Sequence, residues 1–359
     1  GSQPNGTESE EGEDQPDTIG SEDKTDSETE DSQEIHLSLE LIAEDVGADA
    51  QGEKLTLDAA DKLSEKLNVK KDKTIEVTDG EGLILLSNVN PEEYKNFTIE
   101  LITTTGWDLT KPVPVNATSY SFLGLGNDTY PYEGTFGLDA STAAGQFSIM
   151  TSKALFNVLS TKAILSGTIP FRISETASST NKPLLADSLI AADGAVTLNA
   201  NIVLRDLNSD KISDAAVGGL IGTMKEGTSA DITFENQFTK DLKVSGESHT
   251  GLFCNTMEKN TSLTAEFKNT STGKIDVEAA SSAADAGGFV GHMETDASLT
   301  ASGNSVTQVS SASGNAGGLV GSATDGSISI KTGDNLTFAG TLTLKSASDK
   351  SAGGLIGEY

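Results

Sequence analysis

The sequence predicts an all-β fold: a right-handed parallel β-helix with an N-terminal capping helix and a disordered acidic N-terminal tail. Two observations lead to this prediction. A glycine-rich phrase recurs at Val217–Gly222, Ala286–Gly291, Ala316–Gly321 and Ala352–Gly357, and short runs rich in Val, Ile and Thr flank its copies. Repeats at a period of roughly 30–40 residues are typical of solenoids, propellers and other arrays.

Residues 1–34 are predicted to be a disordered acidic linker. Residues 1–35 contain thirteen acidic residues, one base (Lys24) and no aromatic residue. Such a stretch cannot bury enough apolar surface to offset its chain entropy, and its charges repel one another. We therefore expect an extended spacer ahead of the folded part.

Residues 35–80 are predicted to form an N-terminal strand and helix cap. Apolar and polar residues alternate from Ile35 to Leu41, which indicates a strand. Apolar residues at helical spacing follow, namely Leu57, Ala60, Leu63 and Leu67. They predict a helix over Thr56–Asn68 with Thr56 as its N-cap. Because an uncovered β-helix end exposes unpaired backbone groups, we expect this helix to cap the stack.

Residues 81–359 are predicted to form the parallel β-helix. Strand-like runs occur at Lys73–Val77, Gly82–Leu86 and Phe97–Ile102, and from about Ala195 onward the repeat dominates. Each repeat has a β-run ahead of the phrase and another behind it, so that each period carries three strands and no helix. This content fits one coil of a parallel β-helix better than a propeller blade, which needs four strands in ~40–50 residues.

Stacked coils place equivalent residues of the phrase above one another. The phrase also has a degenerate copy at Thr250–Cys254. One apolar column is expected to contain Leu220, Leu252, Phe289, Leu319 and Leu355. The adjacent column is expected to contain Ile221, Phe253, Val290, Val320 and Ile356. Two successive inward residues require a bend or a covered outer face, and glycine permits positive φ and close backbone approach there. Cys254, in place of the last glycine, is expected to be a small buried residue.

The phrase G-G-[LF]-[IV]-G resembles the GLUG motif of large bacterial surface proteins, which include adhesins and immunoglobulin A protease relatives. Leu85–Thr110, Tyr120–Gly137 and Ala154–Ile169 are also similar to segments of these proteins, with Tyr132 where Phe is usual. The resemblance implies a β-helix on the surface of a bacterium, of the Gram-positive type. Because the chain stops directly after a copy of the phrase, we expect the β-helix to be truncated at Tyr359.

The composition restricts the partners of the chain. Lys+Arg 24 against Asp+Glu 54 gives a net charge of −30, which argues against nucleic acid and anionic membranes. No apolar run approaches the ~20 residues of a membrane helix, so no membrane insertion is expected. The three histidines, His36, His249 and His292, match no H-E-x-x-H motif, and Cys254 is the only cysteine. We therefore expect no metal, no cofactor and no catalytic residue.

Parallel β-helices also include polysaccharide lyases and hydrolases, which use clustered carboxylates or bases in a lateral groove. Asp206 with Asp210, and Glu294 with Asp296, are candidate pairs, which we interpret as solvated turn residues. A groove with three or more converging carboxylates or bases would instead favour a carbohydrate-active enzyme.

Three aromatic residues are weak candidates for binding a sugar. Tyr130 and Tyr132 lie in the run Gly126–Gly134, and Trp107 follows a glycine at a strand end. Aromatic rings can stack on sugars, but packing and turn roles are the favoured interpretation for all three.

The sequence leads us to expect a non-catalytic extracellular adhesin or stalk domain, monomeric, that binds a host protein or glycan such as an immunoglobulin or mucin. One alternative is a carrier module of a larger surface protease, and the other is a β-helical carbohydrate-active enzyme. A sortase-type tail beyond Tyr359 would favour the adhesin, and an H-E-x-x-H motif there would favour the protease.

Overall fold

The computed structural model describes residues 57–102, 106–139, 147–173, 182–205, 215–246, 248–324, 329–332, 336–337 and 342–359. All of them belong to one compact unit, Glu34–Tyr359. The predictions of a disordered tail over residues 1–34 and of a strand from Ile35 to Leu41 lie outside the described residues.

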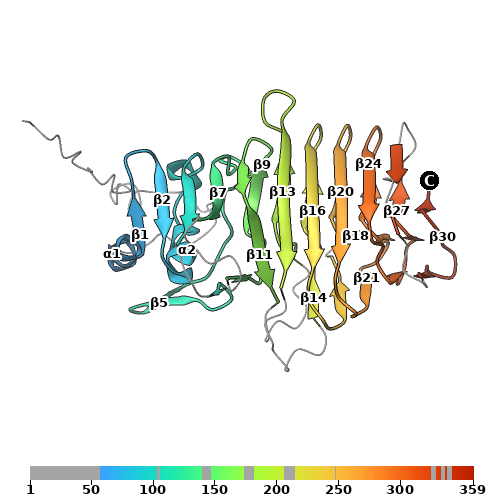
Figure 1. The fold of residues 1–359 in the computed structure, drawn as a ribbon, viewed down its shortest axis with the longest axis horizontal. Helices are drawn as coiled ribbons and strands as arrows, with labels where there is room; N and C mark the ends of the chain where they lie inside the picture. Colours follow the sequence, from blue (N-terminus) through green and yellow to red (C-terminus); the bar gives the residue numbers. More distant parts are fainter. Residues whose placement is uncertain are drawn as a thin grey trace, which may run out of the picture. The chain divides into compact units, whose positions relative to one another are not determined.

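This unit is a parallel β-solenoid of about seven turns, and the all-β, parallel β-helix prediction is confirmed. Figure 1 shows equivalent strands of successive turns lying side by side. The longest sheet has eight strands, in the spatial order β28 (Ser329–Thr332), β24 (Ser298–Gly303), β20 (Ser262–Asn269), β16 (Ser229–Asn236), β13 (Thr197–Leu204), β11 (Thr168–Arg172), β8 (Ile149–Met150) and β4 (Trp107–Asp108).

Three further parallel sheets complete the later turns. A seven-stranded sheet has the order β31 (Ile356–Glu358), β27 (Val320–Ala323), β23 (Val290–Met293), β19 (Cys254–Met257), β15 (Ile221–Met224), β12 (Ala186–Ile190) and β9 (Phe156–Ser160). A five-stranded sheet has the order β14 (Ala215–Val217), β17 (Leu242–Val244), β21 (Ile275–Ala279), β25 (Gln308–Ser311) and β29 (Thr343–Lys345). A four-stranded sheet has the order β18 (Thr250–Gly251), β22 (Ala286–Gly287), β26 (Ala316–Gly317) and β30 (Ala352–Gly353).

The first turns form a five-stranded sheet with a helical end (Figure 1). The sheet has the order β1 (Leu67–Val69), β2 (Thr74–Val77), β3 (Thr98–Leu101), β7 (Thr135–Leu138) and β10 (Ile164–Ser166). Near it are the hairpin of β5 (Val113–Val115) with β6 (Thr118–Tyr120) and a 3₁₀ turn at Pro91–Glu93. No helix among the described residues is long and apolar enough to cross a membrane.

The capping helix ends earlier than the sequence predicts, and its predicted N-cap, Thr56, lies outside the described residues. Helix α1 spans Leu57–Lys66 and buries Ala59, Ala60 and Leu63. Leu67, which fits the helical spacing, instead begins β1 and pairs with Val77 in antiparallel register. The end of a sheet offers unpaired backbone groups at this point, so the chain gains more hydrogen bonds as a strand than as another helical turn.

The run Gly82–Leu86, predicted to be a strand, is helix α2 (Gly80–Leu86). Asp79 caps it, since the Oδ1 of this residue accepts a hydrogen bond from the Gly82 N–H at 3.0 Å. The four large apolar residues that follow Gly82 are all at most 2 % exposed. A short apolar run buried on all sides has no periodicity that separates strand from helix, which explains the wrong prediction. An ion pair of 2.6 Å between Lys66 Nζ and Asp79 Oδ2 links α1 to the cap of α2.

The repeated phrase forms a corner between two strands, so each later turn has four strands rather than the predicted three. In the copy at Ala286–Gly291, β22 ends at Gly287, the chain bends at Gly288 and Phe289, and β23 begins at Val290. The bend allows both Phe289 and Val290 to be fully buried. The predicted bend is therefore present.

The register corrects the predicted columns at one turn. Gly251 pairs with Gly287, and Cys254 pairs with Val290, so Phe253 and not Leu252 lies beside Phe289. The rings of Phe253 and Phe289 are 4.9 Å apart between centroids. The core column is therefore Leu220, Phe253, Phe289, Leu319 and Leu355, and the adjacent column is Ile221, Cys254, Val290, Val320 and Ile356. Leu355, in the last described turn, is 46 % exposed, whereas the other members of its column are at most 1 % exposed.

Close backbone approach explains most of the phrase glycines. A Cβ at Gly287 would lie 2.5 Å from the backbone N of Gly321 in the next turn, and one at Gly321 would lie 2.4 Å from the Gly291 O. Positive φ, the other predicted reason, applies among the phrase glycines only to Gly219, at +83°. In the degenerate copy, Asn255 occupies the place of the last glycine, and not Cys254 as the sequence predicted.

Candidate functional site

Two of the three aromatic binding candidates are core residues. Trp107 is 3 % exposed and packs edge-to-face on Phe147 at 5.3 Å between centroids. Tyr132 is fully buried, and its hydroxyl lies 2.7 Å from the Thr135 carbonyl oxygen and 2.8 Å from that of Phe97. Neither ring is available as a platform for a sugar, which agrees with the packing interpretation.

Tyr130 is the one candidate of the three that reaches the surface. It belongs to a turn in which the Asn127 Oδ1 accepts hydrogen bonds from the backbone N–H groups of Thr129 and Tyr130. The Lys95 ammonium lies 5.3 Å from the centroid of its ring. A hydrogen bond to Glu92 raises the pKa of the Tyr130 hydroxyl. The accessible part of this ring is therefore already flanked by two charged partners.

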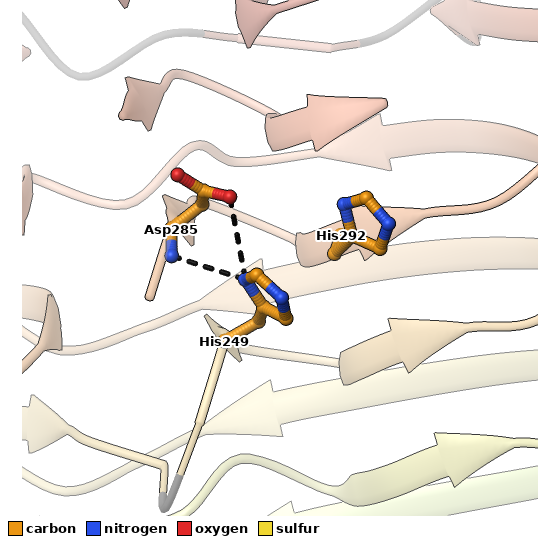
Figure 2. Close-up of side chains that lie close together, drawn as sticks. All are labelled: His249, Asp285 and His292. Carbon is orange, nitrogen blue, oxygen red and sulfur yellow. Dashed lines mark hydrogen bonds and ion pairs between the residues drawn. The ribbon is translucent and has the colours of Figure 1, made fainter. Parts of the chain in front are cut away.

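The described residues contain one group of histidines and carboxylates close enough to suggest chemistry. It consists of His249, Asp285 and His292, whose nitrogen and oxygen atoms lie within 4.8 Å of one another (Figure 2). His249 immediately precedes β18, Asp285 immediately precedes β22, and His292 lies on β23. The imidazole rings are stacked, with centroids 4.8 Å apart and an interplanar angle of 22°.

Asp285 is the centre of a buried hydrogen-bond network. The Asp285 Oδ1 accepts hydrogen bonds from Asn315 N at 2.7 Å and Asn315 Nδ2 at 2.9 Å, and the Asp285 Oδ2 accepts one from Ser322 Oγ at 2.6 Å. Burial by itself would raise the pKa of Asp285. The interactions with His249, Asn315 and Ser322 outweigh burial and hold the pKa well below its usual range. The carboxylate is therefore charged at neutral pH.

The hydrogen bonds of His249 depend on its protonation. The His249 Nδ1 lies 3.0 Å from the backbone N of Asp285 and 3.4 Å from the Asp285 Oδ2 (Figure 2). One ring nitrogen cannot accept from the first group and donate to the second at the same time. The neutral ring, with its proton on Nε2, accepts the backbone N–H. Protonation of Nδ1 favours the carboxylate instead.

The surroundings of His292 favour its neutral form. Burial, followed by the neighbouring charge of His249, lowers the pKa of His292 more than Asp285 and Glu294 raise it. The His292 Nδ1 lies 2.7 Å from the Ser322 Oγ, and Thr324 Oγ1 lies 3.3 Å from the His292 Nε2. Both ring nitrogens therefore have hydroxyl partners.

The cluster is not arranged as a metal centre. A tetrahedral zinc ion with bonds of about 2.0–2.1 Å requires ligand atoms roughly 3.3 Å apart and lying in the plane of each imidazole. Nearly parallel rings with centroids 4.8 Å apart do not share such a point. Binding would also require His292 to give up Ser322 or Thr324, and Asp285 to give up its donors.

The cluster is not arranged as a nucleophilic triad either. In a triad, a histidine lies between the serine and the carboxylate and takes the serine proton. Here Ser322 lies between His292 and Asp285, and its hydroxyl donates a hydrogen bond to the Asp285 Oδ2 at 2.6 Å. Ser322 is also only 5 % exposed. Its hydroxyl is thus neither activated by a base nor accessible.

The network follows a rule that the sequence carries but our sequence reasoning missed. The residue before each Ala/Thr-Gly strand contacts the residue that follows the last phrase position in the next turn. His249 stacks on His292, Asp285 accepts from Ser322, and Asn315 donates to Glu358 at 2.6 Å. We call these pairs the flanking ladder. Polar residues on both sides of each copy of the phrase after Val217–Gly222 were the available signal.

The outer surface of the eight-stranded sheet is a regular polar surface. Equivalent outward positions on β13, β16, β20 and β24 carry small polar or acidic side chains that are exposed or half-buried. We call this surface the polar lateral face, and its members are Thr197, Asn199, Asn201, Ser229, Asp231, Thr233, Ser262, Thr264, Glu266, Ser298, Thr300 and Ser302. Hydroxyls bond across turns, as between Thr197 Oγ1 and Ser229 Oγ at 3.1 Å.

The candidate carboxylate pairs add no catalytic groove in the described part of the chain. Asp206 and Asp210 lie outside the described residues. Glu294 is half-buried and Asp296 is exposed in the turn before β24. Comparisons of the chain with protein-family models, with curated proteins and with solved structures found no match.

Proposed function

We propose that this protein is a non-catalytic, extracellular binding module, an adhesin or stalk domain of a bacterial surface, that holds a host glycan or protein. The polar lateral face is the observation that carries the proposal. Its rows of hydroxyl, amide and carboxylate groups repeat at the strand spacing of about 4.8 Å, which suits repeated polar contacts over a large area.

Two further features support a binding role. The His249–Asp285–His292 group is occupied by the flanking ladder, where it joins successive turns rather than presenting a nucleophile or a base. The resemblance of the glycine phrase to the GLUG motif agrees with a bacterial surface location.

The test uses the full chain against arrays of host glycans, mucins and immunoglobulins. We expect saturable binding of at least one component and no cleavage products. Thr264, exposed at the centre of the polar lateral face on β20, and Thr223, half-buried on β15 of another sheet, form a matched pair. Thr264→Lys should weaken binding by about tenfold or more, whereas Thr223→Lys should leave it within about twofold.

Cleavage of a polysaccharide or an immunoglobulin, abolished by one carboxylate substitution, would overturn the proposal in favour of an enzyme. Equal loss of binding in the two threonine variants would show that the polar lateral face is not the binding surface.

A further inference from the structure

The sequence contains two arginines, and the fold brings them together. Arg172 is the last residue of β11, and Arg205 directly follows β13 in the next turn. Phe171 pairs with Leu204 in parallel register, and the Arg205 backbone N–H donates to the Phe171 O at 2.8 Å. Equivalent residues of adjacent parallel strands lie about 4.8 Å apart and share a face of the sheet. The two side chains therefore begin side by side, facing outward.

Each guanidinium has one buried nitrogen without a hydrogen-bond partner among the described residues. Both residues are half-buried, and the Nε atom of each is shielded from solvent without a hydrogen-bond partner. The nearby carboxylates make their hydrogen bonds with other residues: Glu235 with Gln237 Nε2 at 2.8 Å, and Asp108 with Thr110, while Asp108 also pairs with Lys111. The charge of Glu235 still acts favourably on Arg205, but it does not outweigh the effect of burial, and the pKa of Arg205 is lowered. Two adjacent cations without a direct ion pair among the described residues are unfavourable in a chain that has 54 acidic residues to offer.

A third unsatisfied group faces the same place. Ser148 is fully buried, and its Oγ has no hydrogen-bond partner among the described residues. A Cβ built on Gly106 would lie 3.4 Å from the Ser148 Oγ and 3.7 Å from the Arg172 Cζ. The hydroxyl and the guanidinium thus both face the point at which residue 106, a glycine, has no side chain.

These groups match one kind of ligand. Guanidinium groups bind carboxylate and sulfate oxygens in pairs, and a buried hydroxyl supplies a further donor. Arg172 lies on β11 and Arg205 directly follows β13, which belong to the same sheet as the polar lateral face. A sugar bound along that face would place an acidic substituent near the two arginines.

We propose that Arg172, Arg205 and Ser148 form an oxyanion site that binds the carboxylate or sulfate group of an acidic sugar. The identification of the ligand as a sugar rests on the proposed binding function. The oxyanion chemistry rests on the three unsatisfied groups alone. The strongly acidic chain repels polyanions at long range, so the site selects a single, precisely presented anion over an extended one such as nucleic acid.

The test uses the full chain labelled with ¹⁵N-arginine, in which each arginine gives one side-chain Nε–H signal. The probes are N-acetylneuraminic acid methyl glycoside, glucuronic acid and galactose 6-sulfate, with uncharged galactose for comparison. We expect at least one acidic sugar to shift both signals saturably and galactose to shift neither. Comparing the carboxylate sugars with the sulfate sugar identifies the preferred group.

Four variants assign the binding to the proposed residues. Arg172→Lys and Arg205→Lys keep the charge but remove the planar fork, and each should weaken binding by about tenfold. Ser148→Ala should weaken it by severalfold with an unchanged melting temperature, because the hydroxyl has no partner to lose. Lys243→Gln, on β17 of another sheet, removes one charge as a control and should leave the affinity within about twofold.

Absence of a shift with every acidic sugar, or equal weakening in Lys243→Gln, would overturn the oxyanion site. If the unsubstituted chain binds a host component but no acidic sugar, this site is refuted and the proposed function stands. Binding of an acidic sugar without binding of any host component would support this site and refute the proposed function.

Discussion

The stacking of the glycine phrases predicts that one substitution has very different effects at equivalent places. Gly288, Gly318 and Gly354 occupy the same phrase position in three successive turns. A Cβ at Gly318 would lie 1.9 Å from the Gly354 carbonyl oxygen, and one at Gly288 would lie 2.1 Å from that of Gly318. Nothing lies within 4 Å of a Cβ at Gly354. Gly→Ala therefore adds a methyl group that collides with the backbone of the next turn at Gly288 and Gly318, whereas the same methyl group at Gly354 meets no atom.

The expected cost follows from the displacement that each alanine requires. An ordinary contact of a Cβ begins near 3.4 Å, so the next turn must move away by more than 1 Å. That movement breaks the hydrogen bonds from Gly318 N to Gly353 O, at 3.1 Å, and from Leu319 N to Leu355 O, at 2.9 Å. Each bond contributes about 1 kcal/mol, and overpacking adds about 1–3 kcal/mol. We expect Gly318→Ala to lower the free energy of unfolding by about 3–5 kcal/mol.

Gly288→Ala should cost at least as much, because its neighbouring turns are both held on their far sides. Gly354→Ala should be neutral or stabilise by up to about 1 kcal/mol, since alanine restricts the unfolded chain and none of the positive-φ glycines is Gly354. Urea unfolding followed by circular dichroism measures all three. If Gly354→Ala costs as much as Gly318→Ala, or Gly288→Ala costs less than about 1 kcal/mol, close approach between turns is not the reason for these glycines.

Two further predictions concern the N-terminal end and the flanking ladder. Leu63→Asp places a charge on the buried face of α1 and should lower the free energy of unfolding by about 3 kcal/mol. It should also expose the sheet end, so that light scattering detects association. The control Glu65→Gln, at an exposed position of the same helix, should stay monodisperse, and equal behaviour of the two variants would contradict a capping role. Because burial and His249 lower the pKa of His292, the folded state prefers its neutral ring; this stability is complete above the unfolded pKa of about 6.5 and is lost as the pH falls below it. Melting temperatures between about pH 7.5 and 5.5 should therefore fall less in His292→Gln than in the unsubstituted protein, and parallel curves would refute this assignment.

The sequence determined the fold class because every turn repeats the same local requirements. Alternating apolar residues fix which side of each strand faces the core, as in β20, where Leu263, Ala265 and Phe267 are buried. The returning glycines mark a corner too narrow for a side chain. These are properties of neighbouring residues, and a sequence displays them directly.

The sequence also contained signals that our reasoning did not use. Arg172 and Arg205, the only arginines, lie one repeat apart, and polar residues stand on both sides of each copy of the phrase after Val217–Gly222. Repeat position alone would have placed the two arginines in neighbouring turns. It could not have shown that their Nε atoms lack partners, since that depends on the side chains of several strands.

What only the tertiary structure decided is which residues of neighbouring turns meet. The degenerate copy Thr250–Cys254 can be aligned with the next copy in two ways. The backbone pairing of β18 and β19 selects the alignment that places Phe253 beside Phe289. The same stacking brings Asp285 to Ser322. Only the structure showed that the apolar run after Asp79 is a helix. Contacts between turns depend on the lengths of the intervening loops and on backbone pairing, and neither is a property of the local pattern.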